Sequence, residues 1–321
     1  MTLFNSLRHS PFLLRISQKL PENMRSTVQT AFTSFAAGLS AVAFLFLTNL
    51  IFARSYLVFA TYTKKYFLVA SFLMIATTSL LVGLLLKFFG SEAAGSGIPQ
   101  VKVAFWKELG WIRLRPVIIK FVGGILTIGG GQSLGREGPS VYIGAGVASN
   151  LSGALGTPRR ERRGASIIGA SAGLAAAFNT PLAAITFAIE EVIGDLNSRF
   201  LGRVVLASVI GAFVVYGILG RQPAFSLPSV DNVSWLHYAV VPAVALLAAC
   251  TGRIFLSATL RLRGRLVRQR RLPLWLLPVF GGLITWGIGV TIFLTTGKIG
   301  VFGLGYQDLS SALNNLFDWR I

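Results

Sequence analysis

The chain has 321 residues, of which 53% are hydrophobic and 13% are charged, a composition that excludes a soluble domain with a polar surface. Its formal net charge is +19, but the basic residues fall in loops between apolar segments, without the aromatic or motif pattern of a nucleic-acid-binding domain. The sequence therefore predicts an all-α polytopic membrane protein without a nucleic-acid partner, oriented in the bilayer by its basic loops on the cytoplasmic side.

The first elements are a basic leader and two long apolar segments. Residues 1–25 interleave arginines and lysine with leucines and phenylalanines, a pattern typical of an amphipathic helix on the cytoplasmic membrane surface. Residues 31–53 and 66–89 are long enough to cross a bilayer at about 1.5 Å per residue. The loop at 54–65 is then expected on the outside.

Residues 95–100 read GSGIPQ and are followed by a basic amphipathic stretch at 102–115. The glycines stop the preceding span, and Pro99 suits the first turn of a new helix because its missing N–H is not needed there. Ser96 would then offer a hydroxyl donor beside free backbone N–H groups. An ordinary helix-capping turn explains the spacing equally well.

The next apolar segment, 117–131, carries glycines suited to close helix contact and leads into residues 129–140, which read GGGQSLGREGPS. Pro139 places Glu137 over the N-terminus of a helix, where unpaired N–H donors and a partial positive charge favour an anion. A carboxylate between apolar segments is costly and usually functional. We hypothesise that Glu137 is a tethered anion that competes with a diffusible anion for these donors.

Short helices follow this loop. Residues 141–155 predict a broken or half-crossing helix, residues 158–163 (PRRERR) a cytoplasmic loop, and 165–178 and 181–192 two short helices. Glu190 and Glu191 end the second of these and face about 100° apart, so that one of them is expected to face an aqueous cavity. The alternative is a solvated acidic helix end.

The remaining segments alternate between spans and loops. Spans are predicted at 203–219, 238–260 and 272–296, with an outer loop at 220–237 and a cytoplasmic loop of six arginines at 261–271. Residues 300–306 form a glycine-rich turn before a polar helical tail that is not a further span.

Few residues in the chain suit a metal, a disulfide or a catalytic centre. Cys250 is the single cysteine, and His9 and His237 are the only histidines, which predicts neither a disulfide nor a metal site. The GREGPS stretch lacks the lysine and the spacing of a phosphate-binding loop. The sequence therefore predicts no enzyme and no cofactor, and no signal peptide precedes the first span.

Three stretches together resemble the CLC family of chloride channels and chloride/proton exchangers: GSGIPQ at 95–100, GREGPS at 135–140 and GLAAAFNTPLAAITFAIEE at 173–191. The resemblance runs from about residue 31 to the end of the chain. It implies two inverted repeats whose half-helices point their N-termini at chloride, with one pore per subunit of a homodimer. Residues 1–30 would be a cytoplasmic segment, 31–220 the first repeat and 221–321 a partial second repeat.

The resemblance also implies roles for individual residues. Glu137 resembles the gating glutamate, which also transfers protons on the outer side, and Glu191 the inner proton-transfer glutamate of exchangers. Ser96 is similar to the serine of chloride-preferring members, whereas Gln100 stands where many members have glutamate. The implied chloride-binding residues are Ser96, Gly97, Ile98, Arg136, Gly138 and Pro139.

The resemblance is incomplete in the second repeat. The family's GxFxP filter stretch and a downstream tyrosine are not found, and residues 300–306 resemble the loop before that stretch, so Phe302 is not taken for the filter phenylalanine. We expect chloride/proton exchange in the inner or plasma membrane, with a cytoplasmic N-terminus. The alternatives are a passive, voltage-gated chloride channel, a truncated fragment without activity of its own, or a chain completed by another polypeptide.

Overall fold

A computed structural model describes residues 21–196, 199–220, 235–268 and 273–314 of the chain. These residues form helices and turns, and no strand occurs among them. Most of the predicted N-terminal surface helix, including His9, lies outside the described residues, and so do most of the predicted outer loop at 220–237 and the last residues of the tail.

Helix α3 (Glu22–Phe52) is a long central helix that continues into a π-helical turn at Ala53–Leu57. It is followed by α4 (Lys64–Phe89), which begins where the backbone N–H of Tyr66 donates to the Thr63 hydroxyl at 3.4 Å. Both predicted spans lie within these helices. Their apolar composition and length therefore identified them correctly.

The helices α5 (Ile98–Lys107), α6 (Leu114–Gly129), α7 (Glu137–Ala154) and α8 (Arg162–Phe178) form the core. Small residues let α7 and α8 approach until their backbones touch. A Cβ added to Gly173 would lie 2.6 Å from the carbonyl oxygen of Ser140, and one added to Gly144 would lie 3.1 Å from the Cα of Gly173. This is the packing expected of membrane helices, where van der Waals contact replaces the hydrophobic driving force.

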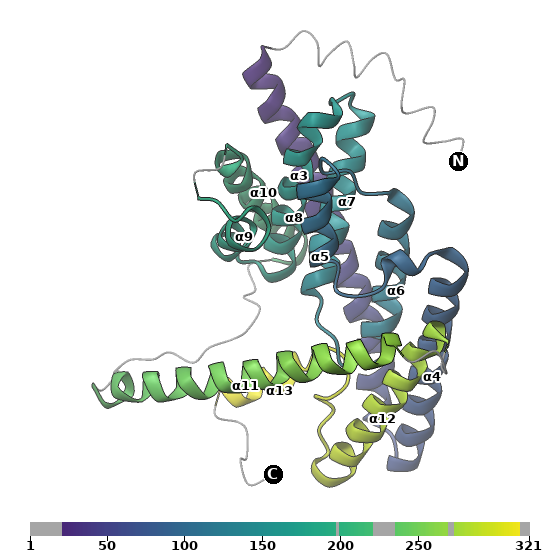
Figure 1. Ribbon diagram of the computed structural model, residues 1–321. Helices are drawn as coiled ribbons and strands as arrows, with labels where there is room; N and C mark the ends of the chain where they lie inside the picture. Colours follow the sequence, from purple (N-terminus) through teal and green to yellow (C-terminus); the bar gives the residue numbers. More distant parts are fainter. Residues whose placement is uncertain (1–20, 197–198, 221–234, 269–272, 315–321) are drawn as a thin grey trace.

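Helix α9 (Pro181–Phe187) runs into a second π-helical turn at Ala188–Ile193, and α10 (Leu201–Leu219) follows it. Helices α8, α9 and α10 gather on one side of α3, whereas α4, α6 and α12 lie on its other side (Figure 1). The short helix predicted at 181–192 is therefore found, although its second half has π geometry.

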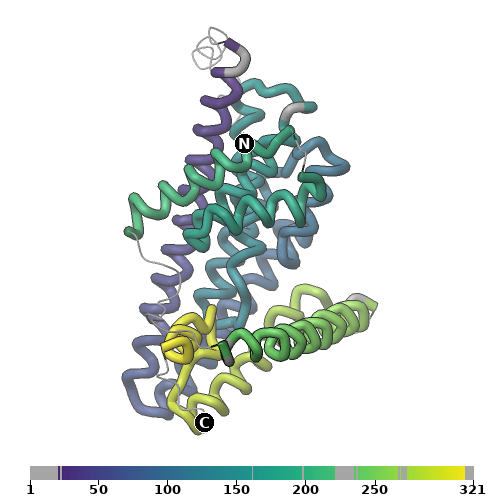
Figure 2. Tube along the Cα trace, turned by 90° about the vertical axis from the view of Figure 1, so that its left-hand side faces the viewer, coloured from purple at the N-terminus to yellow at the C-terminus, as the bar shows by residue number. Residues whose placement is uncertain are grey.

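The last helices are α11 (Trp235–Arg268), α12 (Leu277–Thr296) and α13 (Tyr306–Leu313). Helix α12 packs on α4, where the rings of Phe67 and Phe293 stack at 3.8 Å and the Trp286 indole N–H donates to the Ser71 hydroxyl at 3.1 Å. Helix α11 lies across the direction of α3 in both views (Figures 1 and 2), and none of its apolar stretch is buried.

Two predicted boundaries are wrong. The loop expected from residue 54 begins only after residue 59, because the helix continues through the π-helical turn at Ala53–Leu57. The arginine-rich segment was expected to be a loop from residue 261, but α11 continues to Arg268, because arginine and leucine are strong helix formers and no proline interrupts them. Within the basic amphipathic stretch at 102–115, α5 ends at Lys107 and a turn follows, with Leu109 and Gly110 in the left-handed region (φ 54° and 76°).

Five helices of the described residues are long and apolar enough to cross a membrane. They comprise Met24–Leu57, Lys64–Phe89, Leu201–Leu219, Tyr238–Leu266 and Leu274–Thr296. Helices α5 to α9 are shorter or less apolar. They are packed between longer helices, which is the setting in which broken helices are tolerated at membrane depth.

Candidate functional site

The loop before α5 begins the candidate site. Gly95 and Gly97 have φ values of +86° and +106°, which residues other than glycine rarely adopt. Gly97 is the N-cap of the helix that starts at Ile98. The Gln100 side chain donates to the carbonyl of Ala94 at 2.9 Å and so holds the loop. As predicted from Pro99, a new helix starts two residues after Ser96, at Ile98.

The N-terminus of α7 lies directly against this loop. Arg136 caps α7 and Glu137 is its first residue, as the position of Pro139 predicts. A Cβ added to Gly138 would overlap the carbonyl and hydroxyl oxygens of Ser96, and one added to Gly97 would lie 2.9 Å from the carbonyl oxygen of Gly138. Two helix N-termini from separate parts of the sequence thus converge at the contact between Ser96 and Gly138.

The Glu137 side chain is partly buried beside this contact. Its carboxylate folds back over Gly135, because a Cβ added to that glycine would overlap Oε2 and lie 3.0 Å from Cδ. Gly135 is itself exposed, so the carboxylate lies between the buried start of α7 and an open surface. The helix dipole stabilises a negative charge in this position.

Lys120 holds the loop before α5 through a hydrogen bond, a role that the sequence reasoning missed. This α6 residue is 6% exposed, its ammonium donates to the carbonyl of Gly95 at 2.5 Å, and it lies 5.6 Å from the ring centroid of Tyr142. A lone lysine inside the apolar segment 117–131 was the available signal, since an ionisable residue at membrane depth is functional by default. Lys120 holds Ser96 in place and adds a positive charge to the site.

The loop of residues 129–132 is fixed by two distant segments. The Tyr56 hydroxyl donates to the carbonyl of Gly130 at 3.1 Å, and the backbone N–H of Gly303 donates to that of Gly131 at 3.2 Å. Phe302, next to Gly303, is fully buried with its ring 4.7 Å from that of Tyr56. It packs in an aromatic cluster with Tyr56, Phe67 and Phe293.

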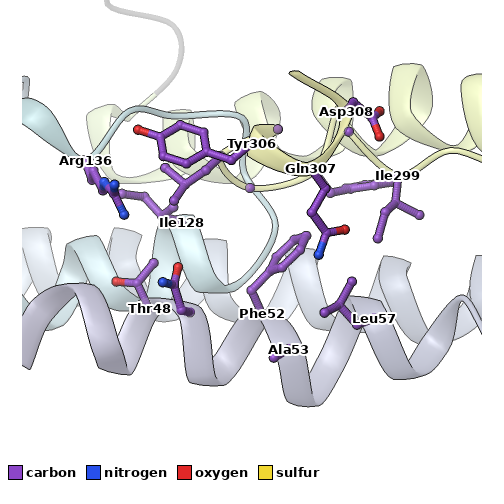
Figure 3. A pocket seen from close by; sticks show the side chains of 16 residues that line it. Thr48, Phe52, Ala53, Leu57, Ile128, Arg136, Ile299, Tyr306, Gln307 and Asp308 are labelled. Atoms are coloured by element: carbon purple, nitrogen blue, oxygen red, sulfur yellow. The ribbon is translucent and has the colours of Figure 1, made fainter. Parts of the chain in front are cut away.

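The surroundings of the Arg136 side chain are the second feature that sequence reasoning missed. It is 6% exposed and lies between two rings, 5.3 Å from the centroid of Phe178 and 4.8 Å from that of Tyr306. Figure 3 shows Arg136 and Tyr306 on the same side of a cavity. No pattern in the sequence pairs these residues, which come from distant parts of the chain.

Glu191 belongs to the π-helical turn after α9 and lies against α5, away from the Ser96 loop. Its carboxylate forms an ion pair with Lys102 at 3.4 Å, and the two side chains are 53% and 49% exposed. The Trp106 indole N–H donates to the carbonyl of Val192 at 3.0 Å, which fixes the π-helical turn against α5. Glu190 is exposed as well. Helix α5 therefore links the Ser96 loop at its start to Glu191 beside its second turn.

The comparison with protein families agrees with this architecture. The family model described as voltage gated chloride channel matches residues 78–321. The chain belongs to the CLC family. Among its curated CLC relatives, the H(+)/Cl(-) exchange transporter ClcA of Vibrio cholerae is 37% identical over 167 residues, which are 50% of this chain and 35% of that protein. ClcA of Salmonella paratyphi B is 34% identical over 200 residues, 60% of this chain and 41% of the relative.

Solved structures of CLC proteins share the fold. A slow cyanobacterial Cl⁻/H⁺ antiporter superposes with a TM-score of 0.78 at 22% identity, covering 91% of this chain and 68% of that one. A CLC-type fluoride/proton antiporter gives a TM-score of 0.74 at 23% identity, covering 92% and 71%. This CLC chain is thus a multi-pass membrane protein, and its matches span less than half the length of these curated relatives.

Proposed function

We propose that this CLC chain transports chloride across the membrane in exchange for protons, with Glu137 as the gate. The observation that carries the proposal is the contact between Ser96 and Gly138, which places a hydroxyl, two helix N-termini and the Glu137 carboxylate in one small region. The curated relatives that match the chain are named H(+)/Cl(-) exchange transporters.

The proposed mechanism is a competition between two anions. Charged Glu137 is attracted to the N–H donors and the dipole at the start of α7, and a chloride ion seeks the same groups. When Glu137 takes up a proton, it loses this attraction and leaves the donors to chloride. When it returns, it releases the proton. Anion movement is in this way tied to proton movement.

Chloride would be held by the Ser96 hydroxyl and by main-chain N–H groups at Gly97, Ile98 and Gly138, with the backbone of Arg136 completing the wall. Pro139 has no N–H and contributes its ring to the wall. Lys120 favours an anion here through its positive charge. The buried lysine thereby offsets part of the cost of removing chloride from water.

Glu191 is the proposed inner proton-transfer residue. Its carboxylate is about half exposed, which gives it access to water, and it forms an ion pair with Lys102 at 3.4 Å. A proton entering from the inner side would first displace this ion pair. Glu190, one position earlier, serves as the matched control because it is exposed and lacks the pairing with Lys102.

The proposal extends to location and assembly: an inner or plasma membrane with a cytoplasmic N-terminus, and a homodimer. Apolar side chains on α9 and α10 support an interface, since Leu182 is 77% exposed and Phe213 is 70% exposed. A single cysteine introduced by Phe213→Cys, in a Cys250→Ser background, should cross-link two copies in membranes. A chain that stays monomeric under oxidation would contradict the dimer.

The transport proposal is tested with the full chain purified and reconstituted in liposomes, with chloride release and proton uptake recorded together. Glu137→Gln and Glu191→Val should each keep chloride flux and abolish proton coupling, whereas Glu190→Gln should keep both. If the reversal potential of the unaltered chain does not change when a proton gradient is applied, a passive channel is favoured. A folded chain that moves neither ion would refute transport by this polypeptide.

A further inference from the structure

The turn between α5 and α6 and the loop between α7 and α8 lie against each other at one end of the helical core. Gly110 touches the backbone of Arg162 and Arg163, since a Cβ added to this glycine would overlap both residues. The Ser149 hydroxyl accepts the Ile112 N–H at 3.2 Å and donates to the carbonyl of Gly110 at 2.6 Å. The two connections are therefore held together as one surface. This surface, called the cation–aromatic surface below, comprises residues 105–113 and 158–163.

Arginines and tryptophans are paired on the cation–aromatic surface. The guanidinium carbons of Arg113 and Arg159 lie 5.7 Å and 5.8 Å from the ring centroid of Trp111. That of Arg163 lies 5.8 Å from the ring of Trp106, and the same guanidinium donates to the carbonyl of Trp106 at 3.2 Å. Cation–π contacts thus hold an arginine beside each of the two indoles. Tryptophan and arginine together are typical of the membrane–water interface, which accommodates an apolar ring and a charged head at once.

The cation–aromatic surface carries an excess of positive charge. Its two stretches contain six basic residues and two acidic ones, Glu108 and Glu161. Arg113 forms an ion pair with Glu92 at 3.3 Å, but both side chains are 62% exposed, so another anion can compete for this arginine. Neither of the two ion pairs between described side chains includes Arg159. The surface therefore favours an anionic partner.

An exposed leucine lies at the tip of the same surface. Leu109 has a φ of 54°, which a bulky side chain rarely adopts, and it is 41% exposed. The Gly110 N–H donates to the carbonyl of Ala104 at 2.7 Å and holds the turn in this conformation. Trp106, at the end of α5, is 52% exposed. A tip that presents apolar side chains among basic ones suits a lipid surface, where the apolar groups enter the acyl boundary and the charges stay among the headgroups.

The length of α5 agrees with a position at headgroup depth. Helix α5 begins beside the contact between Ser96 and Gly138 and has 10 residues, so its end lies about 15 Å away along the helix axis. Sites where half-helices converge lie near the midplane of the bilayer. Half of the hydrocarbon core is also about 15 Å thick. Trp106 and Lys107, the last residues of α5, therefore fall at the boundary between acyl chains and headgroups.

We propose that the cation–aromatic surface binds anionic phospholipids, with a headgroup phosphate held by Arg113 and Arg159 beside the Trp111 ring. Guanidinium groups suit this role because their planar fork of N–H donors matches the oxygens of a phosphate. Leu109 and Trp106 would contact the acyl chains, which a soluble phosphate lacks. The assignment concerns lipid binding and does not depend on transport by the chain.

The test is native mass spectrometry of the purified full chain released from detergent micelles. Dioleoylphosphatidylglycerol serves as the anionic lipid and dioleoylphosphatidylcholine as the neutral match. The chain should bind the anionic lipid more tightly. Arg113→Gln combined with Arg159→Gln should weaken that binding roughly 30-fold, because each basic residue near an anionic surface contributes about fivefold. The matched control is Arg54→Gln combined with Lys65→Gln, which removes the same charge from exposed positions after α3 and at the start of α4 and should leave the preference unchanged.

Leu109→Gly tests the apolar part separately from folding. Glycine adopts a φ of 54° freely, so this variant should unfold close to the temperature of the unaltered chain. Loss of the leucine side chain should nevertheless weaken binding of the anionic lipid roughly threefold to tenfold. A side chain that only holds the turn would give the reverse, a lower unfolding temperature with lipid binding unchanged.

Equal binding of the two lipids by the unaltered chain would overturn the proposal, and so would a preference for the anionic lipid that survives loss of both arginines. Inorganic phosphate and polyglutamate, added at the same charge concentration as the lipid, should displace little of it. If either displaces the lipid completely, the surface serves a soluble phosphate or an acidic protein instead. Thermal unfolding of each variant establishes that it is folded.

Discussion

Replacing Gly138 with alanine is expected to weaken chloride binding by displacing the Ser96 loop. Gly138 has ordinary helical geometry, so alanine is allowed at this position and on backbone grounds would even be favoured. The obstacle is steric. The new Cβ would overlap two oxygen atoms of Ser96 and lie 2.9 Å from its carbonyl carbon.

The size of the effect follows from what has to move. The carbonyl group of Ser96 belongs to a loop that Lys120 and Gln100 hold through hydrogen bonds to Gly95 and Ala94, so the loop cannot shift without loss. Overpacking of this kind costs about 1–3 kcal/mol. That range converts to roughly 5- to 150-fold in a binding constant if the displacement falls on the anion site.

Chloride titration into chloride-free protein, together with thermal unfolding, measures both parts of the effect. Gly202→Ala is the matched control, because Gly202 lies in helix α10 and an added Cβ there meets nothing within 4 Å. The control should bind chloride as the unaltered chain does and unfold at the same or a slightly higher temperature. If Gly138→Ala behaves like Gly202→Ala in both measurements, the reasoning about the Ser96 contact is wrong.

Two further substitutions separate packing from surface charge. Phe302→Ala should lower the free energy of unfolding by about 3–5 kcal/mol because a fully buried ring is lost from the aromatic cluster. Trp235→Ala, at an exposed position, should have little effect. Unfolding of both variants in the same detergent measures these changes, and equal stability of the two would contradict the packing of residues 299–306. Lys102→Met should change the free energy of unfolding by less than about 1 kcal/mol, since its pair with Glu191 is half exposed. It should also slow proton-coupled exchange in the unaltered chain more than it slows the uncoupled chloride flux in the Glu137→Gln background. Equal slowing of the two fluxes would argue against a role for this pair in proton transfer.

The parts of the site that depend on local chemistry could be predicted from the sequence. Proline at 99 and 139 and the glycines before them determine where two helices begin, and Glu137 is the first residue of α7 for that reason. The long apolar spans were equally accessible, because length and composition alone define them.

The parts that depend on tertiary contact could not be predicted. Lys120 reaches Gly95 from another helix, and Tyr306 covers Arg136 from the last described helix, contacts that no local spacing encodes. The continuation of α11 through its arginines shows a different limit. The dense positive charge of residues 261–271 predicted a loop, but arginine and leucine have high helix propensity and the helix continues to Arg268.

The two hydrogen bonds to Gly130 and Gly131 limit how the proposed gate at Glu137 could move. One comes from Tyr56 and the other from Gly303, so the start of the loop that leads to Glu137 is tethered to two separate segments of the chain. A backbone movement that displaced Gly130 and Gly131 would break both hydrogen bonds and disturb a packed aromatic cluster. Rotation about the side-chain bonds of Glu137 alone breaks neither, and such rotations are intrinsically fast. In the proposed transport cycle, the rate should then be set by proton arrival and ion exchange, with the backbone serving as a fixed frame.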